Sequence, residues 1–417
     1  MATEFDAAVV GAGPAGVATA LYAHRHGLSV ILLDKSLFPR DKVCGDAVAR
    51  KSLGYLRDLG ILDDVRMEAH EPISNAVLAA PNGRSIRLDL KGNSPHAPHM
   101  ICRRRIFDDA LVRAARLRVD VREGATVTGV LRGNRGDVCG VRYTSAGNTE
   151  HELTARVVVG ADGFNSVVAR SLGHYRHDTK RWWVATRQYF RGLAVDPETV
   201  EVHYVDDTLP GFLWMFPTGD GAVNVGVGLV HRDAKQRGGI RAVHERVLES
   251  PRFRERFRTA APLEDVRGWN LPTPDSRRVL HGDGFLLAGD AAGLVDPFSG
   301  EGIGNAMCSG EVAARVIARA CVSRRASGSN DTLDATALAE YPRLLLDELD
   351  RRELSIHYRL RSLARRRWLL NFLIGRAASH RGVLNWLSSM TDEHGTLNRK
   401  RALTSPLTYL RLIFKGK

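Results

Sequence analysis

The chain has 417 residues, of which 44% are hydrophobic and 26% are charged, a composition typical of a large globular protein and unlike that of a disordered or fibrous one. Its net charge of +13 is concentrated near the C-terminus, where residues 351–417 contain 15 Lys and Arg against 3 acidic residues. The preceding 350 residues are therefore close to neutral. No aromatic and basic platform accompanies the basic tail, so we expect no nucleic-acid partner.

The cysteine pattern and the apolar runs indicate the cellular compartment. Five scattered cysteines without CxxC spacing fit a reducing cytoplasm better than a disulfide framework, and we predict no metal site. No apolar run approaches the roughly 18–20 residues of a membrane-spanning helix, and a predicted strand begins at once where a signal peptide would lie. We therefore expect a cytoplasmic protein.

Residues 5–34 form the first predicted unit, in the order strand, glycine turn, helix, strand and acid. Three glycines in GxGxxG spacing follow the first strand, and Asp34 ends the second, as in a dinucleotide-binding βαβ unit. The glycines permit a tight turn and close backbone approach to a pyrophosphate, while the acid can accept ribose hydroxyls. The predicted nucleotide contacts here are Gly11, Gly13, Ala15, Gly16, Asp34 and Lys35.

The next part of the chain predicts a loop followed by alternating helices and strands. Pro39 and Gly45 identify the loop. The expected elements are a loop at 35–46, a helix at 47–66, strands over 72–98, an amphipathic helix at 103–116, and strands over 119–131 and 136–159. Sheet segments thus leave the first unit and return to it.

The second half predicts two further glycine turns and a helical end. A turn at 160–166 leads into a helix, and a short strand at 285–287 runs into a second turn. The other expected elements are a β-rich region at 182–230, charged helices at 231–257, a small-residue helix at 300–319, a polar linker at 323–334, and basic helices from 338 to the end.

Both later turns place an Asp beside a glycine at a strand-to-helix junction: Asp162-Gly163 and Gly289-Asp290. A glycine-rich run that includes Gly302, Ile303 and Gly304 follows the second, leaving room for a flat ring against backbone N–H groups. Three such elements exceed what an NAD dehydrogenase needs. They resemble the para-hydroxybenzoate hydroxylase-type flavoprotein superfamily, in which the GxGxxG, DG and GD motifs together bind FAD.

Two further motifs narrow this resemblance. The loop PRDKVCGD at 39–46 and the stretch GFLWMFP at 211–217 look like the PRxKxCG and YxWxFP motifs of the geranylgeranyl reductase family. The tail, with SPLTYLRL at 405–412, is also similar to that family, so the resemblance spans nearly the whole chain. Two departures concern the substrate: Phe212 stands where the family usually has Tyr, and Ala47 where relatives often have Gly.

The resemblance implies roles for residues outside the three turns. Cys44 would lie near the flavin as a proton donor or redox sensor. The alternative is that Cys44 packs as a small hydrophobic residue. Phe212, Trp214 and Phe216 would line an apolar cavity, and we expect at least one of them to be plain sheet core. The other implied FAD contacts are Arg40, Gly45, Arg104 and Val127; for Arg104 the alternative is a solvated helix charge.

The predicted fold is α/β (α+β), with a Rossmann-like FAD-binding domain, an inserted antiparallel β-sheet substrate domain and a C-terminal helical region. The FAD-binding domain is discontinuous. The predicted bounds are 1–75, 99–178 and 268–325 for the FAD-binding domain, 76–98 and 179–267 for the substrate domain, and 335–417 for the basic helices.

The leading functional prediction is an FAD-dependent reductase that acts on C=C bonds of a prenyl chain or another hydrophobic small molecule. The alternatives are an FAD-dependent monooxygenase or oxidative tailoring enzyme acting on a natural product, a halogenase, and a non-catalytic flavin- or lipid-binding protein. The halogenase is the weaker oxidative alternative, because no Lys lies between Lys51 and Lys91. No second GxGxxG unit occurs, so a transient donor is expected: NAD(P)H, a ferredoxin or a reduced flavin.

The basic tail has two interpretations. Basic and apolar residues, including Trp368 and Trp386, mix at near-helical spacing over 365–374 and again over 381–387, as in helices that lie in a membrane interface. The alternative is an amphipathic cap with a solvated basic face, packed on the FAD-binding domain. Both can hold at once, so peripheral membrane contact is compatible with a cytoplasmic protein.

Overall fold

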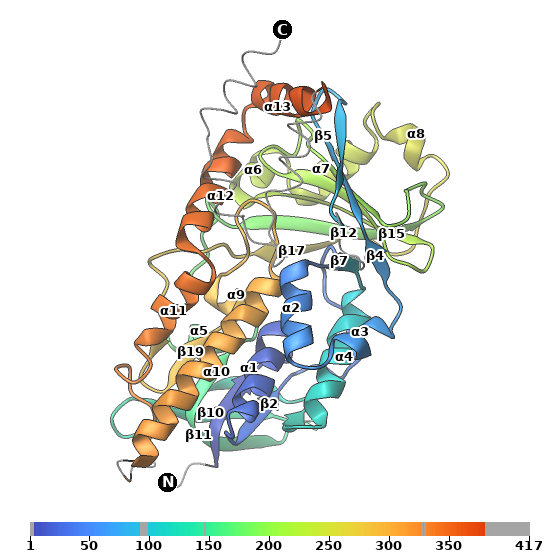
Figure 1. The fold of residues 1–417 in the computed structure, drawn as a ribbon. Coiled ribbons are helices and arrows are strands. Elements are labelled where there is room, and N and C mark those ends of the chain that lie inside the picture. Colours follow the sequence, from blue (N-terminus) through green and yellow to red (C-terminus); the bar gives the residue numbers. More distant parts are fainter. Residues whose placement is uncertain (1–3, 92–98, 146, 327, 329–330, 380–417) are drawn as a thin grey trace.

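A computed structural model describes residues 4–91, 99–145, 147–326, 328 and 331–379. The fold is mixed α/β, as predicted. Two eight-stranded sheets occupy opposite halves of the molecule, and helices α10 to α12 run along one side of it (Figure 1). None of the helices in these described ranges has the length and hydropathy to span a membrane.

The first sheet is built around the N-terminal strand β1 (Phe5–Val10). It pairs in parallel with β2 (Val30–Leu33) on one side and β11 (Glu150–Gly160) on the other. Strands β8 (Asp120–Arg122) and β19 (Phe285–Leu287) extend these sides, giving the parallel order β19–β11–β1–β2–β8. Antiparallel additions are β9 (Thr126–Arg132), β10 (Val138–Thr144) and β18 (His281–Gly282). Strands far apart in sequence thus share one sheet, as a discontinuous Rossmann-like unit requires.

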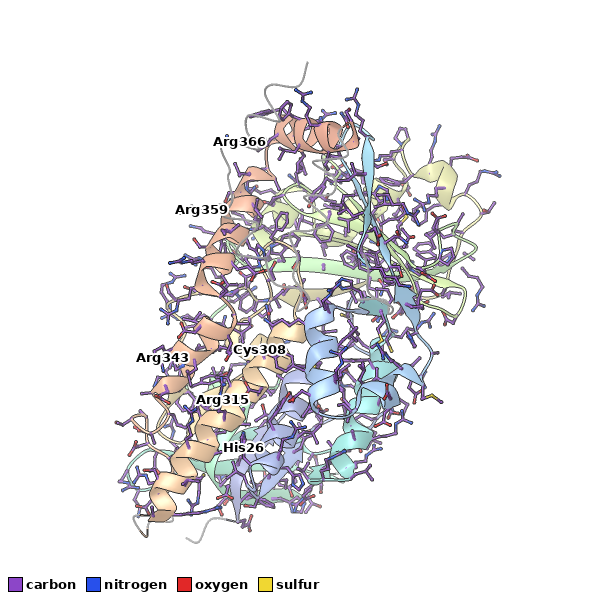
Figure 2. All side chains as sticks on the ribbon, viewed as in Figure 1. His26, Cys308, Arg315, Arg343, Arg359 and Arg366 are labelled. Carbon is purple, nitrogen blue, oxygen red and sulfur yellow. The ribbon has the colours of Figure 1, made fainter. Side chains whose placement is uncertain are left out.

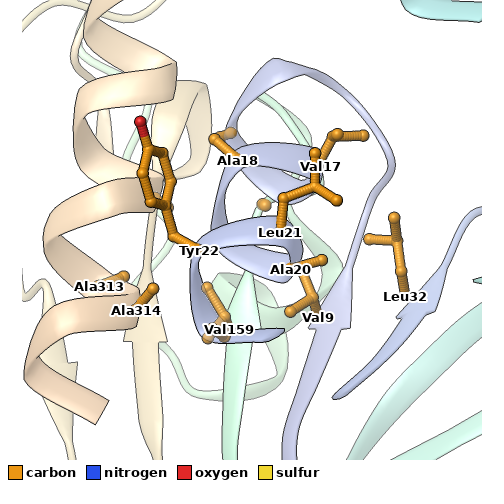
Figure 3. Close-up of a cluster of buried hydrophobic side chains, with 14 of the residues drawn as sticks. Val9, Val17, Ala18, Ala20, Leu21, Tyr22, Leu32, Val159, Ala313 and Ala314 are labelled. Carbon is orange, nitrogen blue, oxygen red and sulfur yellow. The ribbon is translucent and has the colours of Figure 1, made fainter. Parts of the chain in front are cut away.

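Helices α1 (Pro14–Arg25) and α10 (Ile303–Ala326) pack against each other over this sheet. Figure 3 shows the small side chains at this contact, including Ala18, Ala313 and Ala314. A Cβ atom added at Gly310 would lie 2.6 Å from the carbonyl oxygen of Ala15, so only glycine permits this approach. The other helices of this half are α2 (Arg50–Asp58), α3 (Leu62–Arg66), α4 (Arg104–Arg116), α5 (Val167–Ser171) and α9 (Gly289–Ala292).

The second sheet has the order β16–β12–β15–β14–β13–β5–β6, with β17 also paired to β12. Its strands are β5 (Asn75–Ala79), β6 (Ser85–Asp89), β12 (Trp183–Arg191), β13 (Thr199–His203), β14 (Phe212–Pro217), β15 (Ala222–Val230), β16 (Ala261–Pro262) and β17 (Arg267–Leu271). Only the β13–β5 pair is parallel among these ladders. The predicted boundary after residue 267 falls inside β17, which continues this sheet.

Aliphatic side chains bury one face of the second sheet. Leu213 and Met215 on β14 pack in a cluster with Val243 and Val247 of α7 (Ile240–Leu248). Helices α6 (His231–Gln236) and α8 (Arg254–Phe257) neighbour α7. The opposite face, described below, is aromatic. A third, three-stranded sheet of β3 (Ala47–Val48), β7 (His99–Ile101) and β4 (Glu71–Ile73) lies where the two halves meet (Figure 1).

Three predicted helices differ in extent from the observed ones. The expected helix at 47–66 begins with β3 and is divided by a turn at Gly60, whose φ of +71° favours glycine. The region at 231–257 forms α6, α7 and α8, because Gly238 and Gly239 interrupt it at positive φ. Conversely, α10 continues to Ala326, into the predicted linker, because its apolar face stays buried as far as Cys321.

The C-terminal helices α11 (Glu340–Glu348), α12 (Arg351–Leu363) and α13 (Arg367–Ser379) connect the two halves. On α11, Tyr341 is fully buried and donates a 2.8 Å hydrogen bond to the carbonyl of Leu287 in the first sheet. On α13, Ile374 and Ala377 pack with β6 and Tyr204 of the second half. The predicted basic stretch at 381–387 and the motif at 405–412 lie outside the described residues.

Candidate functional site

The three glycine turns converge on one point. Gly11 has a φ of +99°, and a Cβ there would lie 2.5 Å from the carbonyl oxygen of Ala161, which precedes the Asp162-Gly163 turn. Gly289 has a φ of +58°, and a Cβ there would lie 2.8 Å from the Cβ of Ala15 on α1. Each later turn therefore packs directly on the first, at positions where a larger residue would collide.

The N-terminus of α1 forms an anion-binding cradle. No side chain caps this helix, whose N-cap is Gly13, so its first N–H groups are free for a ligand. A Cβ at Gly13 would have open space, with the Arg40 guanidinium 3.9 Å away. A Cβ at Gly16 would lie 1.8 Å from the oxygen of Gly11, which fixes the tight turn. Backbone donors and one arginine thus face the same space.

Asp34 lies at the end of β2, where the fingerprint predicts it. Its Oδ2 accepts the N–H of Ala12 at 2.7 Å, and its Oδ1 accepts that of Ser36 at 2.8 Å. Each carboxylate oxygen can accept a second hydrogen bond, so both remain available to ribose hydroxyls. The neighbouring Lys35 is exposed and forms no hydrogen bond or ion pair within the described part of the chain, so its predicted role in nucleotide binding rests on the motif alone.

Arg104 is a buried ion-pair partner, not a solvated helix charge. It is 2% exposed, and its Nε and Nη2 donate to the two oxygens of Asp108 at 2.7 and 2.6 Å. Arg40 donates to the same carboxylate at 2.8 Å. Burial disfavours the Asp108 carboxylate, but the two guanidinium groups outweigh it and lower its pKa. The exposed arginine of this run is Arg105.

The loop at 35–46 is held to the second sheet. Arg187 on β12 is fully buried and donates to Asp41 at 2.7 Å and to Glu264 at 3.0 Å. Lys42 pairs with Asp290 at 3.2 Å, so the loop also reaches the third glycine turn. The Cys44 thiol lies half-buried beside the Arg104 guanidinium. The loop therefore lies at the junction of both halves.

A fully buried carboxyl, Asp46, ends this loop. Its Oδ2 accepts the Tyr189 hydroxyl at 2.5 Å and an N–H of Asn224 at 2.7 Å. Burial raises the pKa of Asp46 to about 6, although these hydrogen bonds oppose the rise. The same Asn224 amide donates to the carbonyl oxygen of Cys44 at 2.9 Å.

A cavity of about 440 Å³ extends from this loop across the aromatic face of the second sheet. Residues 212, 214 and 216 all line it, so the expectation that one of them is plain core is wrong. Evenly spaced strand positions share one face, which places Leu213 and Met215 in the core instead. Ring centroids lie 6.4 Å apart from Phe212 to Trp214 and 6.2 Å apart from Trp214 to Phe216.

The cavity also touches the residues predicted to face a flavin ring. Cys44 and Gly45 from the loop, Asp290 from the third turn, and Gly302 and Ile303 from the run after it all line it. Gly304, the last glycine of that run, packs against Lys51 and Glu301. Segments from positions 44, 290 and 303 thus border the same space as the aromatic wall.

Comparison with known proteins identifies the family. An FAD binding domain model matches residues 4–337. Digeranylgeranylglycerophospholipid reductase 1 of Methanopyrus kandleri is 31% identical over 76% of this chain and 81% of its own length. The menaquinone reductase of Mycolicibacterium smegmatis is 30% identical over 76% and 78%.

The chain belongs to the geranylgeranyl reductase family of FAD-dependent oxidoreductases. Its fold agrees with that of a solved geranylgeranyl bacteriochlorophyll reductase-like protein from Thermoplasma acidophilum, with a TM-score of 0.77, 23% identity, and coverage of 92% of this chain and 96% of that one. A flavin-dependent brominase variant has the same fold, with a TM-score of 0.71, 20% identity, and coverage of 98% and 94%.

The geometry of this geranylgeranyl reductase family member suits FAD. The α1 cradle suits the phosphates of FAD, Asp34 suits the ribose, and the glycine-lined space beside Asp290 suits the flavin ring. Asp162 Oδ1 is buried and has no hydrogen-bond partner in the described residues, a polar atom that a ligand or water would satisfy. Val127, the predicted adenine neighbour, lies on β9 two residues after Ala125, whose N–H donates to the Asp34 carbonyl at 2.9 Å.

Several residues at the site were not predicted from the sequence. They are Lys42, Asp46, Asp108, Arg187, Tyr189 and Asn224. Lys42 and Asp46 lie within the quoted loop motif, and Asp108 lies four residues after Arg104 on one helix, so their proximity was visible in the sequence. Nothing in the pattern of β12 or β15 distinguished Arg187, Tyr189 or Asn224 from ordinary strand residues.

Proposed function

We propose that the enzyme reduces carbon–carbon double bonds in the prenyl chain of a lipid or an isoprenoid quinone. The observation that supports this most directly is one cavity that borders the predicted flavin-facing residues at one end and an aromatic wall at the other. Its lining is predominantly apolar, as a hydrocarbon chain requires. The relatives named above act on a digeranylgeranyl lipid and a menaquinone, which share a prenyl chain.

The chain's own residues would bind and orient the substrate. FAD, when bound and reduced, supplies the hydride. Phe212 and Trp214 would hold an apolar chain against the β14 wall and exclude water from it. Cys44, at the cavity edge beside Arg104, is the proposed source of the proton for the second carbon. Its thiol lines the cavity and can donate a proton directly into this space.

The test is an anaerobic single-turnover assay. The holoenzyme, reduced with dithionite, is incubated with a geranylgeranyl glycerophospholipid or a menaquinone, and the product masses are measured by mass spectrometry. We expect a gain of two mass units per reduced double bond, and a much smaller yield from Trp214→Ala at equal FAD content. An unchanged substrate mass in both arms would contradict the proposal.

The oxidative alternative needs a separate measurement, because the same fold occurs in flavin-dependent halogenases. Oxygen consumption and NAD(P)H turnover are recorded with and without substrate. Substrate-stimulated oxygen uptake that ends in a hydroxylated or halogenated product would replace the reductase proposal. The reductase proposal is supported if saturated product forms under anaerobic conditions and its formation stops when oxygen is admitted.

The electron donor is proposed to bind transiently. Candidates are NAD(P)H, a ferredoxin and a reduced flavin. Stopped-flow reduction of the bound FAD by each donor under anaerobic conditions ranks them by rate. A donor that reduces the flavin more than about tenfold faster than the others is the physiological class we propose.

We further propose that this cytoplasmic enzyme contacts an anionic membrane through α12 and α13. Exposed apolar side chains on these helices are Ile356, Leu360, Leu363, Trp368 and Leu373. Positions 356, 360 and 363 share one face of α12. Figure 2 shows Arg359 and Arg366 projecting from the same edge of the molecule. Apolar side chains among arginines suit the interface of an anionic bilayer.

Vesicle sedimentation tests this surface. We expect binding to vesicles with phosphatidylglycerol, weak binding to phosphatidylcholine alone, and a loss of several-fold in Trp368→Ser. The control is Leu117→Ser, which removes an apolar side chain at the end of α4 in the other half; Leu117 is 83% exposed, against 64% for Trp368. Equal binding by both variants would refute the assignment to α12 and α13.

A further inference from the structure

The side-chain amide of Asn224 joins the flavin-facing loop to the cavity wall. Its Oδ1 accepts the indole N–H of Trp214 at 2.9 Å. Its Nδ2 donates to the carbonyl oxygen of Cys44 at 2.9 Å and to Asp46 Oδ2 at 2.7 Å. Both amide hydrogens and the amide oxygen are therefore used, and the residue is fully buried. One side chain thus fixes two structures that would face different ligands.

Asp46 anchors this amide to two further elements. Its Oδ1 accepts the backbone N–H of Arg104 at the start of α4 at 3.2 Å, and its Oδ2 accepts the Tyr189 hydroxyl of β12 at 2.5 Å. The backbone of Asp46 has a φ of +63°, in the left-handed region that Asp adopts more readily than most residues. The carboxylate therefore receives three donors from α4, β12 and β15, two from the second sheet and one from the first half.

The turn before Asp46 lies close to the aromatic wall. A Cβ added at Gly45 would lie 3.4 Å from the ring of Phe216 and 3.5 Å from Trp214 Nε1, which is van der Waals distance. The gap between the Cys44–Gly45 turn and the wall is thus about one methyl group wide, and the Asn224 amide bridges it, so a change in the Asn224 hydrogen bonds would shift both. We propose that Asp46 and Asn224 are positioning residues that hold this turn and Trp214 in one fixed relation. The proposal rests on the proposed function only in assigning the wall to the substrate.

The charges around Asp46 make the pair sensitive to a second carboxylate. Arg187 and Tyr189 face it from β12, Arg104 faces it from α4, and Cys102 faces it from the segment just before α4. Arg187 and Arg104 are already committed to Asp41, Glu264 and Asp108. No free cation among these neighbours would neutralise a carboxylate at position 224, so two carboxylates there could coexist only by sharing a proton.

The test is a substitution and its reversal, measured on the full chain. Asn224→Asp places a second carboxylate beside Asp46, and Asp46→Asn with Asn224→Asp restores one carboxylate and one amide. The dissociation constant for FAD is measured by flavin fluorescence between pH 5 and 8, together with KM and kcat for a geranylgeranyl glycerophospholipid. We expect Asn224→Asp to bind FAD at least about tenfold more weakly at pH 8 and close to normally at pH 5.

The exchanged double variant should recover most of the loss at pH 8. A purely structural role for Asn224 would give a defect that does not depend on pH and that the exchange does not relieve. Normal FAD affinity and KM in Asn224→Asp at every pH, or additive defects in the double variant, would overturn the proposal. The control is Asn82→Asp in the exposed β5–β6 turn, which adds the same charge where its Oδ1 accepts the Arg84 N–H.

Tyr189→Phe keeps the proposal testable if Asn224→Asp does not fold. It removes one hydrogen bond to Asp46 and leaves the Asn224 bridge intact. We expect FAD affinity to fall by about threefold to tenfold, with kcat affected more than KM. FAD binding is measured without turnover. If the variants bind FAD more weakly but the wild type reduces none of the prenyl substrates, the reductase proposal fails and the positioning proposal stands. Unchanged affinity and kcat in Tyr189→Phe would count against Asp46 as an anchor.

Discussion

The two sheets build their parts of the site by different means. Around β1, α1 and α10 the packing relies on Ala and Gly, and backbone atoms approach each other at Gly11, Gly16 and Gly310. Around β12, β14 and β15 the site consists of aromatic rings and buried charged groups such as Arg187 and Asp46. The first half therefore forms its part of the site mainly from backbone, and the second half mainly from side chains.

This difference predicts how each half responds to substitution. Backbone cradles cannot adjust, because the clashing atom belongs to the main chain. Side-chain walls lose or gain single contacts and can change specificity without loss of fold. Substitutions in the first half should abolish cofactor binding, whereas those in the second should separate substrate binding from cofactor binding.

The largest effect is expected for Gly16→Ala. Its Cβ would lie 1.8 Å from the oxygen of Gly11, so the turn cannot form. We expect the free energy of unfolding to fall by more than about 4 kcal/mol and FAD binding to be lost. The control is Gly54→Ala on α2, where a Cβ meets no atom within 4 Å and should stabilise by about 0.5–1 kcal/mol. Urea denaturation measures the stability of both variants, and flavin absorbance measures their FAD content. Retention of FAD by Gly16→Ala would contradict the proposed difference between the two halves.

Arg104→Met should destabilise the protein by about 3–5 kcal/mol, because it leaves the buried Asp108 carboxylate with Arg40 alone. Arg105→Met, on the exposed side of the same helix, should change stability by less than about 0.5 kcal/mol. Chemical denaturation compares the two variants. Equal effects would mean that the buried pair carries no special weight.

A buried ion pair in the second half gives a pH dependence. Burial disfavours ionised Glu201, but hydrogen bonds from Arg256 and His203 outweigh it and lower the pKa of Glu201 to about 2. Because this lies below the unfolded value, the stabilisation is present above about pH 4.5 and is lost as the pH falls towards 2. Glu201→Gln should therefore cost up to about 3 kcal/mol at pH 7 and progressively less below pH 4.

Denaturation of wild type and Glu201→Gln at pH 7, 4.5 and 3 measures this change. The control is Glu255→Gln, whose pair with Arg258 is exposed and should contribute less than about 0.5 kcal/mol. A stability difference between wild type and Glu201→Gln that stays constant down to pH 3 would contradict the assigned pKa shift.

The smallest effect is expected for Phe212→Tyr. The added hydroxyl enters the apolar wall between Trp183, Tyr204 and Trp214, so KM for an apolar prenyl substrate should rise by less than about tenfold with FAD affinity unchanged. Phe216→Tyr, which lies against the Gly45 turn, should alter FAD affinity as well. Steady-state kinetics and FAD titration are measured for both variants. The same response from both would contradict the proposed division of the cavity into a substrate part and a flavin part.

The sequence predicted the first half more completely than the second. Glycine spacing directly encodes positive φ and close approach, which is why the turns could be identified from Gly11, Gly16 and Gly289. The resemblance of the three turns to a flavoprotein superfamily then implied FAD. The FAD contact of Arg104 stays a prediction, and the sequence analysis did not anticipate its buried ion pair with Asp108. Arg187, Tyr189 and Asn224 depend on a strand register that brings β12 and β15 to the loop at 35–46, and no local pattern specifies that contact.

The placement of α13 has a consequence for biosynthesis. The far end of the cavity lies against β5, β13 and Tyr204, and α13, about 290 residues after β5, packs over that cluster. The last parallel strand of the first sheet, β19, leaves the ribosome well before α13 does. A nascent chain can therefore assemble its nucleotide fold first, and α13 packs behind the far wall of the cavity only after nearly all of the chain's residues have been translated.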